Sequence, residues 1–163
     1  MLHGTVTFRQ TTRFDEAIAE EFFGWRWLAF KGLPMSNHPD YRKRTEMRVR
    51  RFFPPDKDLH KSWFDEFLRY EYVPATGDEP LSYCYCSSNG PHMVPPYTGS
   101  RDAFVAVAKE LKKRRRWDAY WDILKGLVGE NIYHLSIAEP KTCCLAALAA
   151  IGSKYVTTTS DAG

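Results

Sequence analysis

The sequence contains no long hydrophobic run. Its longest apolar-rich segment, around Thr142–Ile151, is far shorter than the roughly 20 residues needed to cross a bilayer. The N-terminus also lacks the charged and then apolar pattern of a secretory signal. We therefore expect a soluble, unexported, cytoplasmic protein with no membrane partner.

Sequence motifs for catalysis and metal binding are absent as well. The five histidines are scattered, without H-x-x-x-H or H-E-x-x-H spacing, which argues against a metal site. There is no Walker loop, no G-x-S-x-G and no glycine-rich turn from strand to helix. Ser100 could be a nucleophile, but it stands just before an expected helix, where capping is the favoured role. We therefore expect a non-enzymatic protein without metal or cofactor.

The spacing of the cysteines is not that of a zinc site or a redox pair. The four cysteines form C-x-C at Cys84 and Cys86 and C-C at Cys143 and Cys144. Neighbouring residues on a strand or helix point their Cβ atoms apart, so we expect no disulfide within either pair. Cys84 or Cys86 could be a reactive thiolate, but a buried thiol is the favoured interpretation.

Positive charge is concentrated in two segments. Residues 41–51, YRKRTEMRVRR, and 109–116, KELKKRRR, each contain six basic residues and one acidic residue, so each carries +5. The net charge of the chain is +3, which leaves −7 for the remainder. This polarity fits a phosphate-bearing partner or an acidic patch on another subunit. The alternative is a solvated charged surface, and the helix dipole accounts for part of the second segment.

Hydrophobic spacing and capping residues predict three helices. Apolar residues recur at helical spacing in the first, around 13–23, and Thr12 and Asp15 have the spacing of a capping box. Ser100 is placed to cap the second, at 101–115. The third, at 141–151, begins beside a proline and stops at a glycine.

Alternation and turn residues predict the strands. They are expected at 81–87, at 45–53 and in the segments WDAYWDIL and NIYHLSI, although WDAYWDIL could also be helical. Residues 83–86 and 132–137 should share one largely antiparallel sheet. KSWFDEFLRY, at 61–70, reads as a short helix or turn.

This order of elements predicts an α+β fold, an antiparallel sheet packed between helices. The length predicts a single domain over residues 1–152. Residues 33–80 form an insertion within it, and residues 153–163 are expected to be a disordered tail.

Three blocks of sequence carry a resemblance to a known family. IAEEFFGWRW, PPYTGSRDAFVAVAKEL and EPKTCCLAALAAIG, in this order, resemble the phage ABA sandwich domain family, small proteins of phages and prophages. The blocks cover about half the chain. Gly99 and Ser100 replace the Thr-Asp of the family's middle motif, and Cys143 and Cys144 also depart from its pattern. The resemblance implies an α-β-α sandwich and a phage origin, with no established activity to transfer.

Arginine next to aromatic residues is the strongest indication of a binding site. Aromatic residues make up 15% of the chain. A flat ring stacks on an aromatic side chain, while arginine pairs with a phosphate through two hydrogen bonds. The expected ligand-binding residues are Trp27, Arg48, Arg50, Phe52 and Tyr97. Core packing is the competing role for such aromatic residues.

Three functions remain open at this point. The favoured one is binding of a small phosphorylated ligand, such as a cyclic nucleotide signal of host immunity that a phage protein would sequester. The second is an accessory protein that binds nucleic acid through Arg42–Arg51 and Lys112–Arg116. The third is a protein-interaction module, and the sequence is compatible with a homo-oligomer.

Overall fold

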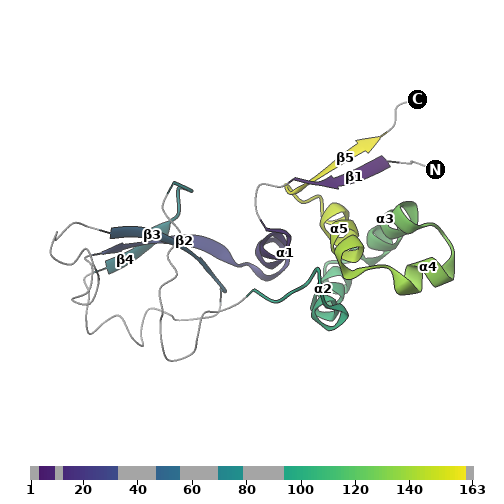
Figure 1. Cartoon of the computed structure of the whole chain (residues 1–163), viewed down its shortest axis with the longest axis horizontal. Helices are drawn as coiled ribbons and strands as arrows, with labels where there is room; N and C mark the ends of the chain where they lie inside the picture. Colours follow the sequence, from purple (N-terminus) through teal and green to yellow (C-terminus); the bar gives the residue numbers. More distant parts are fainter. Residues whose placement is uncertain (1–3, 10–12, 33–46, 56–69, 79–93, 161–163) are drawn as a thin grey trace. The chain divides into compact units, whose positions relative to one another are not determined.

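The chain divides into two compact units, which are described separately (Figure 1). Unit 1 comprises residues 1–23 and 94–163, and unit 2 comprises residues 24–93, so the insertion expected at 33–80 falls inside unit 2. The structure is a computed structural model that describes residues 4–9, 13–32, 47–55, 70–78 and 94–160.

Unit 1 combines helices with a two-stranded antiparallel sheet. The sheet joins the two ends of the described chain, with Phe8 opposite Val156 and Gly4 opposite Ser160. The elements of this unit are β1 (Gly4–Phe8), α1 (Phe14–Phe23), α2 (Arg101–Lys113), α3 (Trp117–Val128), α4 (Ile132–Ile137), α5 (Pro140–Ala150) and β5 (Val156–Ser160).

Unit 2 contains a three-stranded antiparallel sheet. Its strands are β2 (Arg26–Gly32), β3 (Met47–Phe53) and β4 (Tyr70–Pro74), and β2 lies between the other two. The strand predicted at 45–53 is confirmed by β3. Helices and antiparallel strands together confirm the predicted α+β class.

The three predicted helices are confirmed by α1, α2 and α5. Ser100 caps α2 as expected, because its backbone is extended and its Oγ accepts a hydrogen bond from the Ala103 N–H at 3.3 Å. Asp15, expected to complete a capping box with Thr12, accepts the Thr98 N–H at 2.8 Å and so links α1 to the loop before α2. Thr12 itself lies outside the described residues.

Two predicted strands are helices. The segment WDAYWDIL forms most of α3, which confirms the alternative considered for it, because its large side chains recur at helical rather than alternating spacing. The prediction of a strand at 132–137 is wrong, since these residues form α4. Asn131 caps that helix by accepting the Tyr133 N–H at 2.8 Å. An asparagine at this position indicates the start of a helix, against the alternating pattern that predicted a strand.

The expectation of a disordered tail at 153–163 is corrected by β5. Thr157, Thr158 and Thr159 suit a strand, and β1 at the other end of the chain supplies the partner that the local sequence lacks. The predicted strand at 81–87 and most of the segment 61–70 lie outside the described residues.

The core of unit 1 is formed where helices meet over small residues. Alanines of α1 and α5 are buried, and short side chains let neighbouring helices approach closely. The largest side chains that are fully buried are Ile18, Leu111, Leu124, Leu148, Val107 and Cys144. They come from α1, α2, α3 and α5, so these four helices share one core.

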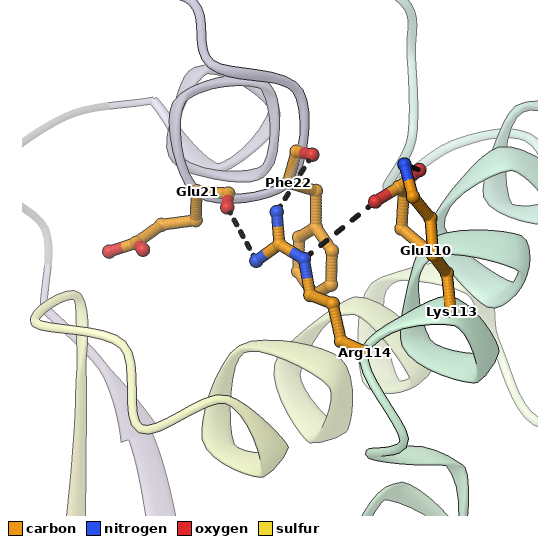
Figure 2. A network of polar contacts seen from close by, with 5 residues as sticks. All are labelled: Glu21, Phe22, Glu110, Lys113 and Arg114. Carbon is orange, nitrogen blue, oxygen red and sulfur yellow. Dashed lines mark hydrogen bonds and ion pairs between the residues drawn. The ribbon is translucent and has the colours of Figure 1, made fainter.

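Arg114, which follows α2, satisfies the C-terminal end of α1 (Figure 2). Its two terminal nitrogens donate to the carbonyl oxygens of Glu21 at 2.9 Å and Phe22 at 3.0 Å. Its guanidinium also lies over the Phe22 ring, 5.2 Å from the centroid. The last turn of α1 has no basic residue of its own, so Arg114 supplies the positive charge that the helix end favours.

Replacing Arg114 with alanine should therefore destabilise unit 1. Two carbonyls lose charged donors, and we expect the free energy of unfolding to fall by about 1–3 kcal/mol. Arg114→Lys should recover only part of the loss, because a single ammonium lacks the two-pronged geometry. Urea denaturation measures both variants.

Lys113→Ala is the matched control, because Lys113 is exposed and pairs only with Glu110 of the same helix, at 3.4 Å. Its effect should stay within about 0.5 kcal/mol. Equal losses in the Arg114 and Lys113 variants would contradict the capping role.

Two helices of unit 1 end in the same hydrogen-bonded turn with different residues at its left-handed position. At the end of α5, the backbone N–H of Ser153 donates to the Leu148 carbonyl and that of Gly152 to the Ala149 carbonyl, with Gly152 at φ 68°. At the end of α2, the backbone N–H of Arg116 donates to the Leu111 carbonyl and that of Arg115 to the Lys112 carbonyl, with Arg115 at φ 56°. Glycine adopts this conformation freely, whereas arginine is strained in it.

Arg115→Gly should consequently stabilise the protein. Relief of about 1–2 kcal/mol of left-handed strain exceeds the roughly 0.4–1 kcal/mol lost to a freer unfolded chain. A net gain of about 0.5–1 kcal/mol is expected, measured as a higher urea midpoint.

Gly152→Ala tests the same principle in the opposite direction and should destabilise by about 1 kcal/mol. A Cβ at Gly152 would meet no atom within 4 Å, so the loss would come from the backbone alone.

Candidate functional site

Four of the five residues expected to bind a ligand lie on one pair of strands in unit 2. The antiparallel register of β2 and β3 places Trp27 opposite Phe52, Ala29 opposite Arg50 and Lys31 opposite Arg48. Opposed residues share a face of the sheet, and alternate residues along a strand return to that face. The positions of the two arginines and the two aromatic residues therefore follow one another along a single face.

An aromatic cluster forms one end of this face. The Phe52 ring centroid lies 4.9 Å from that of Trp27 and 5.3 Å from that of Trp25. All three side chains are half-buried, so each retains some exposed surface. Ala29, near the middle of the face, is fully buried. The aromatic end of the face is thus partly accessible.

Sequence reasoning missed Trp25 as part of this cluster. The helical spacing of Phe14, Ile18, Phe22 and Trp25 favours a place for Trp25 on the apolar side of the first helix, but α1 ends at Phe23. Gly24 follows in a left-handed conformation, at φ 69°, and separates Trp25 from the helix. The spacing of two residues between Trp25 and Trp27, which is strand-like, was the available signal.

Tyr97 has a different environment. It belongs to unit 1, is only 4% exposed and stacks on Phe23 with ring centroids 5.3 Å apart. Burial, reinforced by Asp15 and Cys144, raises the pKa of the Tyr97 hydroxyl to about 12. A ligand could stack on this ring only by displacing its neighbours, so its described surroundings favour core packing.

Half of the basic residues in the second basic segment make structural contacts. The Lys112 ammonium lies over the Trp117 ring, 4.7 Å from its centroid, and Lys113 pairs with Glu110 at 3.4 Å. Arg114 caps α1 as described above. Within the described residues, the side chains of Arg115 and Arg116 have no such contact.

A polar cluster that the sequence did not suggest joins α1 to the turn before β5. Lys154 pairs with Glu20 at 2.7 Å, and the Tyr155 hydroxyl donates to the same carboxylate. The Ser153 hydroxyl donates to Glu21 at 2.9 Å. Burial and the bond to Glu20 raise the pKa of the Tyr155 hydroxyl to about 12. Each donor has an acceptor within the cluster, so it serves as a structural link.

Neither cysteine of unit 1 is suited to nucleophilic chemistry. Cys143 and Cys144 are free thiols, and burial raises the pKa of both above the ordinary value. Cys144 donates its S–H to the Tyr97 carbonyl oxygen at 3.3 Å, which fixes the loop before α2 onto α5. Cys84 and Cys86 lie outside the described residues.

Metal binding and membrane insertion find no support in the described part of the chain. There, no group of three or more His, Cys, Asp or Glu side chains is placed to hold a metal ion. None of the helices in the described ranges is long and apolar enough to cross a membrane.

Comparisons with protein-family models, curated proteins and solved structures found no match. The resemblance to the phage ABA sandwich domain family therefore stays a prediction.

We expect Cys144 to resist alkylation in the native protein. Its side chain is fully buried, and its raised pKa leaves almost no thiolate at pH 8. Iodoacetamide followed by peptide mass spectrometry should leave Cys144 unmodified until urea unfolds the chain. Alkylation in buffer at the rate of a free thiol would show that α5 does not bury it.

Proposed function

We propose that the chain binds a small phosphorylated ligand at the β2–β3 face of unit 2 and does not catalyse a reaction. The observation that carries the proposal is the aromatic cluster of Phe52 with Trp27 and Trp25, the residue just before β2, beside the positions of Arg48 and Arg50 on β3. Trp27, Arg48, Arg50 and Phe52 are also residues that the sequence predicts for ring stacking and phosphate binding.

The two parts of the face suit the two parts of a nucleotide. A flat base gains about 1–3 kcal/mol from stacking on an aromatic side chain. A guanidinium can hold two phosphate oxygens at once. Arg50 is two positions from Phe52, and Arg48 is two further along β3. Strand residues rise about 3.3 Å each, so successive positions on one face are about 7 Å apart, close to the separation of base and phosphate in a compact nucleotide.

A cyclic nucleotide is the proposed ligand class, and sequestration is the proposed purpose. A phage protein that retains an immune signal of its host needs affinity and no chemistry. The resemblance of three sequence blocks to a phage family supports this context, and the proposed location is the host cytoplasm. The structural role of Ser100 and the raised pKa of the Cys143 and Cys144 thiols support a non-enzymatic function.

Ligand identity can be sought by mass spectrometry of small molecules that copurify with the full chain from phage-infected cells. Isothermal titration with a panel of cyclic mononucleotides and dinucleotides then measures affinity. Arg48→Ala and Arg50→Ala should each weaken binding by about ten- to a hundredfold, because each removes a charge-assisted contact worth roughly 1.5–3 kcal/mol. Phe52→Leu, which keeps an apolar side chain, should lose the stacking contribution.

Lys113→Ala is the control, because it removes one positive charge from unit 1 and leaves unit 2 unchanged. Its affinity for the nucleotide should equal that of the unmodified protein. A small and equal loss in all the basic variants, with strong salt dependence, would reject a pocket and favour diffuse attraction.

A further inference from the structure

The basic residues around the end of α2 form an exposed surface, which we call the α2–α3 corner. It consists of residues 109–118 and carries a charge of +4, with Glu110 and Asp118 as its acidic members. The corner belongs to unit 1 and shares no residue with the ligand face of unit 2.

Contacts within unit 1 account for three of the six cations of the corner and leave Lys109 and two arginines. Lys112 lies over Trp117, Lys113 pairs with Glu110 and Arg114 caps α1. Arg115 and Arg116 are exposed, and within the described residues their guanidinium groups have no hydrogen-bond or ion-pair partner. The folding of unit 1 therefore makes no evident use of these two groups.

Arg115 stands where the backbone favours a different residue. Among the described residues it is the one non-glycine residue with a positive φ, 56°. Gly152 occupies the corresponding position at the end of α5, so the same turn is formed elsewhere in this chain by a glycine, without backbone strain. Strain that a single substitution would relieve indicates that the arginine side chain serves something other than stability.

We propose that Arg115 and Arg116 bind the phosphodiester backbone of nucleic acid. Guanidinium groups fit phosphate oxygens through paired hydrogen bonds. The Arg115 and Arg116 N–H groups are bonded to the Lys112 and Leu111 carbonyls, so the two side chains start from a fixed turn. Lys109, also exposed, extends the positive surface along α2.

Contact with the phosphodiester backbone predicts that the protein binds nucleic acid without preference for its base sequence. Lys112 covers a face of Trp117, the aromatic ring beside the two arginines, so this face is not open for stacking on a base. An anionic membrane fits less well, because surface binding to lipid combines basic residues with exposed apolar side chains, and residues 109–116 of the corner expose none.

The test is fluorescence anisotropy of the full chain with a labelled 20-base-pair DNA duplex, titrated between 50 and 200 mM NaCl. Each phosphate contact contributes about −0.9 to the slope of log K against log salt. Arg115→Gly and Arg116→Ala should each make that slope shallower by about one. Each should also weaken binding about two- to fivefold at low salt, the range for an exposed charge pair. A duplex of different sequence should give the same values.

Arg115→Gly is informative because it separates binding from folding. The variant should be more stable than the original chain and yet bind DNA less well, so misfolding cannot explain its loss. Lys113→Ala removes the same formal charge from the same surface and should leave the slope unchanged, since Lys113 already pairs with Glu110.

Three results would overturn the proposal. They are unchanged DNA binding in Arg115→Gly, equal losses in the Arg115 and Lys113 variants, and binding to phosphatidylserine vesicles with none to DNA. None of them bears on nucleotide binding by unit 2, whose failure would appear in the Arg48 and Arg50 titrations instead.

Discussion

The capping of α1 by Arg114 is the interaction on which the arrangement of unit 1 depends. A helix end leaves several carbonyl groups without partners, and α1 has no basic residue in its last turn to compensate. Arg114 lies 92 and 93 positions from the residues whose carbonyls it satisfies, so it joins two helices that the chain separates widely. Cation–π contact with Phe22 adds a second attraction between the same elements.

Unit 1 is closed by contacts between the two ends of the described chain. β1 pairs with β5, and Glu20 and Glu21 of α1 receive hydrogen bonds from the turn that precedes β5. Asp15 and Cys144 both hold the loop before α2, by bonds to the Thr98 N–H and to the Tyr97 carbonyl. The sequence around residues 95–111 that resembles a family motif is therefore a structural junction of unit 1.

The two basic segments play different parts despite their equal charge. In the second segment, structural contacts use Lys112, Lys113 and Arg114, and Lys109, Arg115 and Arg116 remain for a partner. In the first, Arg48 and Arg50 are placed by strand register beside aromatic positions. The count of charges is the same for both segments, because a formal charge carries no information about which carbonyl, ring or carboxylate lies next to it.

Local sequence determined the elements whose signals lie within a few residues. Ser100, the helical spacing of α1 and α5, and the alternation in β3 each act at short range, and their predictions were correct. Trp27, Arg48, Arg50 and Phe52 were expected to bind one ligand, and the register of β2 and β3 gives them positions on one face. Tertiary structure decided the rest. β5 needs a strand partner about 150 residues away. α4 forms with the Asn131 cap although its hydrophobic pattern alternates like a strand. Tyr97 is buried by residues distant in the chain. Arg114 caps α1 because folding brings it next to the last carbonyls of that helix. The role of a charged side chain depends on its neighbours in space, and these are fixed only when the chain folds.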